Sequence, residues 1–192
     1  MNGKRRLRRP VLLAAVTLAL LIGAGGTWAY AEYAEYLAAP TVDPAQSRAL
    51  LPVIDRYLTS DQGMIGDDAA ADPQTGPDGT TVCAERIIEI RPSGHSLLVG
   101  LLATCGDYRS GGGSLVSGES ASEAVELTLS PDSGPGTRVT AAVYEPDDVP
   151  ASWYRAHFSR AGAAEVSRLE MAGSDPDPTA KARAALGLPA AP

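Results

Sequence analysis

Residues 11–31 form a run of 21 residues without a charged side chain. As a helix this run is about 31 Å long, which matches the hydrocarbon core of a typical bilayer, about 30 Å thick. Five basic residues precede the run and no acid occurs before Glu32. The positive-inside bias therefore places the N-terminus in the cytoplasm and the rest of the chain outside it. The sequence predicts a single membrane anchor followed by an exported domain.

A cleavable signal peptide is the alternative interpretation of this segment. It would combine the basic start and the apolar run with an Ala29-Tyr30-Ala31 pattern, and cleavage would follow Ala31. The length of the run favours a retained anchor. So do the aromatic residues at its outer end, because Trp and Tyr gather at membrane interfaces. Both interpretations place the domain outside the cytoplasm.

The exported part is strongly acidic. Beyond residue 31 there are 11 basic and 23 acidic residues, a net charge of −12. Nucleic-acid binding needs a basic surface that neutralises phosphates, so nucleic acid is not expected as a partner. The sequence divides into five segments: a basic cytoplasmic tail at 1–10, the span at 11–31, a linker at 32–43, an α+β domain at 44–172 and a tail with a short helix at 173–192.

Cys83 and Cys105 are the two cysteines of the chain. Outside the cytoplasm an even pair predicts a disulfide, and the absence of C-x-x-C spacing argues against a redox-active pair. Residues 80–90 are rich in Val, Ile and Thr, residues 96–105 form an apolar run, and turn residues lie between them, which predicts a β-hairpin. In the register that places Cys83 opposite Cys105, Ile87 lies opposite Leu101. A register one residue away would separate the cysteines unless a bulge restored the pairing.

The remaining segments predict helices at both ends of a strand meander. Asp43 and Pro44 favour the start of a helix that Pro52 would kink, with these residues on its buried side: Leu50, Leu51, Ile54, Tyr57 and Leu58. Residues 61–79 predict a solvated acidic loop, with a calcium site as the alternative, and 106–118 a flexible glycine-rich connection. Two further strands are predicted at 123–130 and 137–144, the second with Val139, Ala141 and Val143 on one face. The C-terminal helices are predicted at 151–160, where Gly162 ends the helix, at 163–171 and at 180–186.

This order of elements indicates an α+β fold in which helices pack against one face of a curved antiparallel sheet of about four strands. One long helix before a four-strand meander, over residues 43–145, is similar to the cystatin and NTF2-like arrangement. The whole chain, with its basic tail, single span and Ala/Gly/Asp-rich domain, also resembles membrane-anchored exported proteins of actinobacteria. Neither resemblance implies a particular activity.

No motif for catalysis, a cofactor or a metal was found: the chain lacks G-x-S-x-G, S-x-x-K and H-E-x-x-H, and two histidines without a free thiol argue against zinc. Glu85 and Glu89 are expected together on the solvent side of one strand. Trp153, His157 and Phe158 form an aromatic group expected to pack on the sheet, with a pocket or a partner surface as the alternative.

The leading hypothesis is a non-enzymatic accessory or interaction domain at the bacterial cell envelope, with an envelope protein as its partner and no cofactor. The first alternative is a small-molecule-binding module that uses the concave face of the sheet. The second is a hydrolase with an unfamiliar site, in which a base and a nucleophile must lie within hydrogen-bond reach.

Overall fold

The computed structural model describes residues 40–60, 64, 79–131 and 136–191. It shows an α+β domain built on one antiparallel sheet with the strand order β1-β2-β3-β4. The predicted anchor at 11–31, the signal cleavage site and most of the acidic loop at 61–79 lie outside the described residues. The elements are α2 (Pro44–Ser60), β1 (Thr80–Ser93), β2 (Ser96–Gly111), β3 (Ser114–Pro131), β4 (Thr137–Tyr144), α3 (Ala151–His157), α4 (Arg160–Met171) and α5 (Thr179–Ala185).

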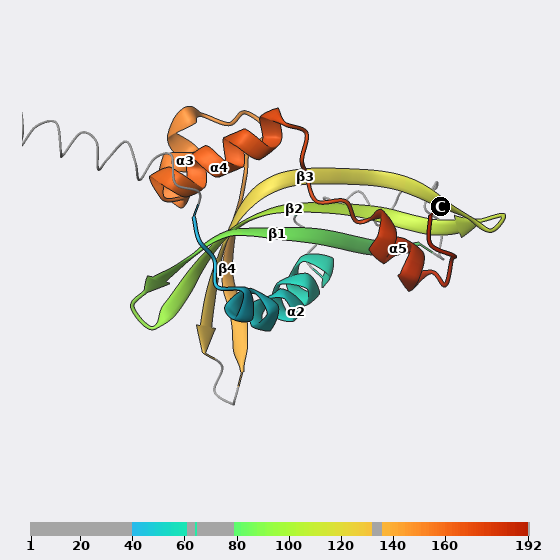
Figure 1. Cartoon of the computed structure of the whole chain (residues 1–192), viewed down its shortest axis with the longest axis horizontal. Helices are drawn as coiled ribbons and strands as arrows, with labels where there is room; N and C mark the ends of the chain where they lie inside the picture. Colours follow the sequence, from blue (N-terminus) through green and yellow to red (C-terminus); the bar gives the residue numbers. More distant parts are fainter. Residues whose placement is uncertain (1–39, 61–63, 65–78, 132–135, 192) are drawn as a thin grey trace, which may run out of the picture. The chain divides into compact units, whose positions relative to one another are not determined.

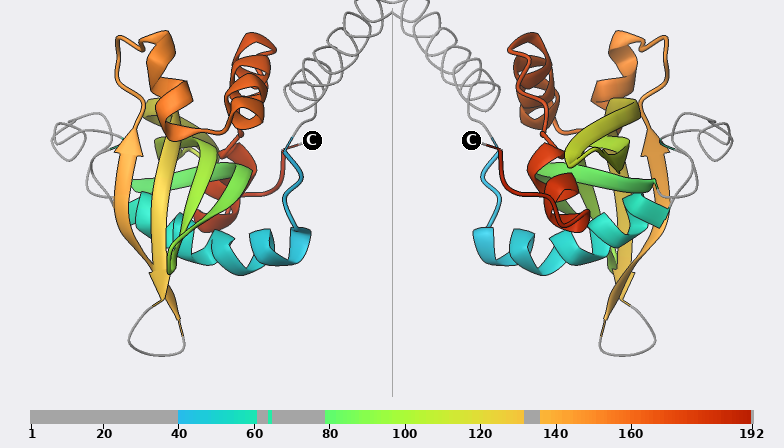
Figure 2. Two further views of the ribbon diagram at one scale, coloured as in Figure 1. Left: turned by 90° about the vertical axis from the view of Figure 1, so that its left-hand side faces the viewer. Right: turned by 90° about the vertical axis from the view of Figure 1, so that its right-hand side faces the viewer.

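Helices cover both faces of the curved sheet, and the expectation that they pack against one face is wrong. Helix α2 lies on the concave face, while α3 and α4 lie on the convex face (Figures 1 and 2). The central strand β2 explains this arrangement, because Leu101, Leu102 and Ala103 are consecutive and all buried. Consecutive residues of a strand point to opposite faces, so this strand needs apolar cover on both sides.

Helix α2 fills the concave side. The Asp43 carboxylate accepts a hydrogen bond from the Ala45 N–H at 2.9 Å, which confirms the expected N-cap. Leu50, Ile54 and Leu58 recur every four residues and are buried in the core, and Leu51 and Tyr57 are half-buried. Pro52 lies inside a single helix whose range is Pro44–Ser60 and does not end it.

The disulfide between Cys83 and Cys105 is present, with an S–S distance of 2.02 Å. The predicted register is confirmed from Cys83↔Cys105 to Ile87↔Leu101. Beyond Ile87 the register shifts by one residue, so that Glu89 pairs with Gly100. The two-residue turn of the hairpin therefore sets a register in which the cysteines would miss each other, and a bulge at Ile88 brings them together.

The same bulge separates Glu85 from Glu89, which were expected on one solvent-facing side. Glu85 lies on the concave side near α2 and α5, where it is 3.5 Å from Lys181. Glu89 is buried beneath the start of α4, where it contacts Ser159. An extra residue on one strand reverses the alternation beyond it, so the expectation of a shared wet face is wrong.

The expected flexible connection at 106–118 is instead a long hairpin. Strand β2 continues to Gly111, and β3 begins at Ser114. Only Gly112 and Gly113 form the turn, both with positive φ (60° and 81°), as a tight hairpin turn requires. The glycines and serines of these strands weaken the periodicity on which strand prediction depends.

Strand β4 has the predicted range, but its predicted buried face is wrong. The register shifts between Thr128↔Ala141 and Leu129↔Val139. This second bulge leaves Val139 facing the core and turns Ala141 and Val143 outward, so that Ala142 and Tyr144 pack inward in their place.

The C-terminal helices divide at a different residue than expected. Helix α3 ends at His157, and Ser159 caps α4 by accepting a hydrogen bond from the Gly162 N–H at 3.0 Å. Gly162 therefore lies in the first turn of α4 and does not end a helix. A Cβ at Gly162 would overlap the Glu89 carboxylate, so this glycine allows the close approach. Helix α5 has the expected place, with Asp177 capping the Thr179 N–H at 2.9 Å.

Candidate functional site: an acidic pocket beside the open edge of β3

The predicted aromatic group comes together on the convex face. The Trp153 ring lies 4.8 Å from that of His157 and 6.1 Å from that of Phe158, between ring centroids. Phe158 is buried and lies so close to Gly100 that a Cβ there would be 2.5 Å from the Phe158 ring. The aromatic group thus packs on the sheet, and its use as a pocket or partner surface stays a prediction.

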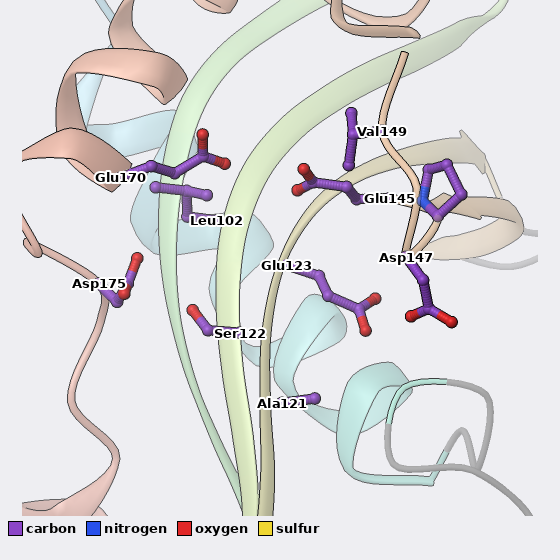
Figure 3. Close-up of a pocket in the computed structure, with 10 residues that line it drawn as sticks. Leu102, Ala121, Ser122, Glu123, Glu145, Asp147, Val149, Glu170 and Asp175 are labelled. Carbon is purple, nitrogen blue, oxygen red and sulfur yellow. The ribbon is translucent and has the colours of Figure 1, made fainter.

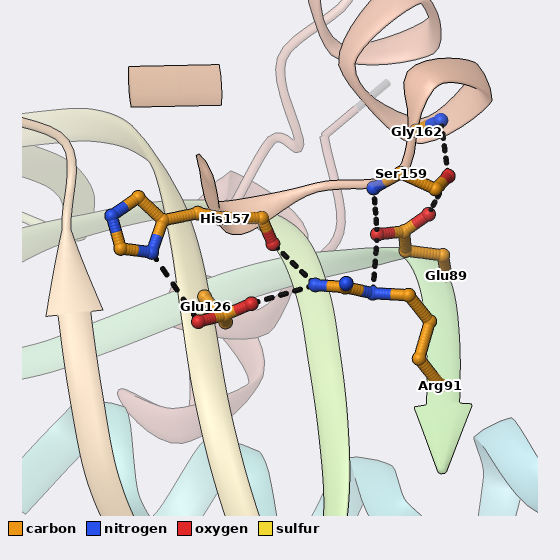
Figure 4. Close-up of polar contacts among 6 residues, drawn as sticks. All are labelled: Glu89, Arg91, Glu126, His157, Ser159 and Gly162. Carbon is orange, nitrogen blue, oxygen red and sulfur yellow. Dashed lines mark hydrogen bonds and ion pairs between the residues drawn. The ribbon is translucent and has the colours of Figure 1, made fainter. Parts of the chain in front are cut away.

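A polar network fastens the α3–α4 junction to the sheet (Figure 4). Glu89 accepts hydrogen bonds from the backbone N–H of Ser159 at 2.8 Å and from its hydroxyl group. Arg91 forms ion pairs with Glu89 at 2.9 Å and with Glu126 at 2.7 Å. The His157 Nδ1 atom lies 3.3 Å from the other Glu126 oxygen. These contacts hold three segments together, and the hydrolase alternative stays a prediction.

A second cluster ties α5 to the edge of the sheet. The Lys181 ammonium group donates to Asp55 of α2 at 2.5 Å and to the Cys83 carbonyl of β1 at 2.7 Å, and lies 3.5 Å from Glu85. The Glu85 side chain is 7% exposed. Burial raises the pKa of Glu85, Lys181 lowers it and Asp55 raises it, and together they bring it to about 7. This carboxyl group is thus a buried titratable group in the core of the domain.

A pocket of about 400 Å³ lies at the edge of β3, with lining residues on both sides of that strand (Figure 3). Half of its lining residues are acids and none is basic. Two acids come from the loop after β4, one from β3, one from the end of α4 and one from the segment after it. The lining residues are Leu102, Ala121, Ser122, Glu123, Glu145, Pro146, Asp147, Val149, Glu170 and Asp175.

Glu145 builds the wall of this pocket where β4 ends. Its backbone N–H donates to the Ala124 carbonyl at 3.0 Å, as a further residue of β4 would. Its side-chain carboxylate accepts a hydrogen bond from the Ala124 N–H at 2.9 Å. In a regular antiparallel ladder, a backbone carbonyl of the neighbouring strand would accept this bond. Pro146 follows, and among the described residues the pairing with β3 extends no further than Glu145. The strand therefore stops here and leaves the remaining length of β3 as an edge.

Burial and mutual repulsion raise the pKa of two of the pocket carboxyl groups. For Glu123 the main cause is burial, followed by the charges of Glu145 and Asp147. For Glu170 it is again burial, followed by Glu145, while a hydrogen bond from Tyr154 acts in the opposite direction. Both groups therefore ionise less readily than an isolated glutamate.

Tyr154 is the hydrogen-bond donor between the two acidic walls. Its hydroxyl group donates to Glu145 and lies 3.1 Å from the nearer Glu170 oxygen. Burial, the hydrogen bond to Glu145 and the nearby charges raise the pKa of Tyr154, so the phenol stays protonated at neutral pH. The pocket thus combines several negative charges with a neutral donor, and it could accept a positively charged group.

Within the described part of the chain, no group of three His, Cys, Asp or Glu side chains is placed to hold a metal ion. The acids of the pocket are spread around a volume in the range of small-molecule sites, which are about 300–1,000 Å³. An organic cation matches this size and dispersion better than a bare metal ion. The acids of the 65–78 segment, for which calcium was the alternative, lie outside the described residues.

Sequence reasoning did not find this pocket. Glu123, Glu145 and Glu170 lie far apart in the chain, and no motif connects them. The strand range that contains Glu123 was predicted, but the end of β4 depends on Glu145 bonding through its side chain, which no periodicity reveals. The sequence did show that the domain is acidic overall, but this net charge did not indicate where in the fold a pocket would lie.

Comparison with known proteins yields no family, curated protein or solved structure that matches this chain. The resemblances to cystatin and NTF2-like folds and to actinobacterial anchored proteins therefore stay predictions. Among the helices in the described ranges, none is long and apolar enough to cross a membrane.

Proposed function

We propose that this chain is a non-enzymatic binding protein of the bacterial cell envelope, and that its acidic pocket accepts an ammonium or guanidinium group of its ligand or protein partner. One observation supports this above the others: five carboxylates and no basic residue line a single cavity. The concave face, where a small-molecule site was the alternative, is filled by α2 through Leu50, Ile54 and Leu58. Binding is therefore assigned to the pocket at the edge of β3.

The energetics of the pocket favour a cationic guest. Ionising Glu123 or Glu170 is costly because each group is partly buried and faces like charges. A bound guanidinium group removes that cost, since an opposite charge within about 4–6 Å favours the ionised carboxylate. By linkage, binding must then release protons and become stronger as the pH rises through the raised pKa values.

We assign residues 11–31 as the element that holds the domain at the outer surface of the membrane, with secretion after cleavage at Ala31 as the alternative. The uncharged length of the run and the preceding basic cluster support the anchor. Alkaline carbonate extraction tests this: an anchored protein stays in the membrane pellet, whereas soluble protein that begins at Glu32 would contradict the assignment.

Binding of arginine amide to the exported domain tests the pocket. We expect calorimetry to detect binding that is stronger at about pH 8 than at about pH 5 and weaker at high salt. Glu123→Gln and Glu170→Gln should each weaken it by about tenfold, because each variant loses one charge-assisted contact of about 1.4 kcal/mol.

The matched control is Glu119→Gln. Glu119 is an exposed acid of the same strand as Glu123 and is not part of the pocket lining, so this variant changes the net charge equally and should bind normally. Citrulline amide, which keeps the α-ammonium group of arginine amide but lacks its guanidinium charge, should bind more weakly. Equal binding of the two amides, or an equal loss in the Glu119 variant, would refute the proposed site.

A further inference from the structure

Among the described strands, none pairs with the first half of β3 on one side. Strand β3 is Ser114–Pro131, but β4 pairs only with its second half, from Val125 to Pro131. Glu145 satisfies the backbone of Ala124, and the chain then leaves the sheet at Pro146. The first half of β3 is thus an edge with β2 on its other side (Figure 1).

The backbone groups that face outward along this edge can be assigned. Ala124 directs its N–H and C=O toward Glu145. These groups alternate between the two neighbours along an antiparallel strand, so Ser122 and Ser120 direct theirs to the same side. Within 40–60, 64, 79–131 and 136–191, no hydrogen bond reaches the outward N–H or C=O of either serine. These groups can accept the backbone of another strand.

This edge has a defined length, and its own side chains give little steric cover. The register shift between Gly106↔Ser120 and Tyr108↔Ser117 places an extra residue in β3, and such a bulge ends regular pairing on that side. Between the bulge and Ala124 the side chains are short, apart from that of Glu123, and Ser120 and Ser122 are exposed. A strand can therefore approach to the usual spacing of about 4.8 Å.

The edge and the acidic pocket are continuous. Ala121, Ser122 and Glu123 belong to the edge and also line the pocket, as Figure 3 shows. A strand laid along this edge would direct alternate side chains to the convex face, where Glu170 and Asp175 also lie. A lysine or arginine at such a position would extend into the pocket, so backbone and charge recognition coincide.

We propose that the edge at residues 120–124 binds an extended segment of a partner protein by β-strand addition, with a basic side chain of that segment in the acidic pocket. This inference rests on the proposed function, because it names the partner class of the same pocket. The charge of the domain identifies the partner as basic. Residues beyond 31 have a net charge of −12, so a second copy of this chain would be repelled.

Substitution at Ser122 tests backbone pairing with a matched control. Ser122→Pro removes the outward N–H and leaves the bonds to β2 intact, and proline is tolerated on edge strands at such positions. Ser122→Ala keeps the N–H. Both variants lose the hydrogen bond between the Ser122 and Thr104 hydroxyl groups, so they differ in the backbone group under test. The probe is a short labelled Thr/Val peptide with one central arginine, measured by fluorescence anisotropy.

We expect the proline variant to bind this peptide at least about tenfold more weakly than the alanine variant, which keeps the outward N–H. Arginine amide should bind the two variants alike, because both lack the same pocket-lining hydroxyl group and this probe does not pair with the backbone. Equal peptide binding by the two variants would overturn strand addition and leave the proposed pocket in place. If the wild type binds neither the peptide nor arginine amide, both proposals are overturned.

Two further measurements keep the test decisive. If the proline variant does not fold, the wild type is tested with a peptide N-methylated on the pairing side, and undiminished binding of that peptide would overturn strand addition. Sedimentation of the wild type alone tests whether a second copy of this chain occupies the edge instead. Self-association that Ser122→Pro abolishes would assign the edge to a second copy of this chain and refute the basic partner.

Discussion

Replacing Cys83 and Cys105 together with alanine is expected to lower the free energy of unfolding by about 3 kcal/mol. The disulfide closes a loop with a sequence separation of 22 residues, for which the chain-entropy estimate is about 3 kcal/mol. Both cysteines are fully buried in the concave core, and Cys105 lies 3.5 Å from the Met64 sulfur. The loss is a large share of a total stability of about 5–15 kcal/mol.

Urea unfolding of the exported domain measures this effect. The double alanine variant avoids an unpaired buried thiol, so the loss reports the cross-link and the small change in packing. The wild type treated with a reductant should lose about as much stability as the variant, and the variant itself should not respond to the reductant. An unchanged midpoint in the variant would show that the disulfide does not stabilise the domain.

The second large effect is a pH dependence that originates at Glu85. Burial raises the pKa of this carboxyl group from 4.5 to about 7 in the folded protein. The folded state therefore holds the proton more tightly than the unfolded state, and stability must fall as the pH rises between these two values. The full shift corresponds to about 3 kcal/mol. Lys181 is partly exposed and water screens the cluster, so about 2 kcal/mol is expected.

The variant Glu85→Gln isolates the pH-dependent contribution of Glu85 to the free energy of unfolding, because glutamine resembles the protonated acid. From about pH 5 to about pH 8, the wild type should lose about 2 kcal/mol relative to the glutamine variant, and the difference should level off above the folded-state pKa. Glu119→Gln is the control, since this exposed acid should leave the pH profile unchanged. Parallel profiles for wild type and Glu85→Gln would contradict a buried, titrating Glu85.

The sequence permitted prediction of those parts of the fold that depend on local pattern and covalent constraint. The α+β class, the helix that Asp43 caps and the pairing of Cys83 with Cys105 were predicted correctly, because N-cap chemistry, periodicity and a disulfide each constrain the chain directly. The bulge at Ile88 was allowed as a way to restore the pairing, but nothing in the sequence gave its position.

Two of the errors share one physical origin, which is that a single extra residue reverses the faces of a strand. The bulge at Ile88 moved Glu89 to the convex side of the sheet. The second bulge, in β4, turned Ala141 outward. The long hairpin around Gly112 was missed because glycine and serine satisfy strand pairing without an apolar pattern. The candidate pocket could not be predicted at all, since its acids come from separate segments that only the completed fold brings together.

The most direct test of the proposed binding site is an NMR pH titration of the Glu123 and Glu170 side-chain carboxyl groups, with and without arginine amide. In the free domain both pKa values should lie above the ordinary value of 4.5, because the groups are partly buried and face other acids. Saturating arginine amide should lower both pKa values, and citrulline amide, which lacks the guanidinium charge, should lower them less. If both pKa values stay unchanged when arginine amide is added, the pocket does not bind a basic group.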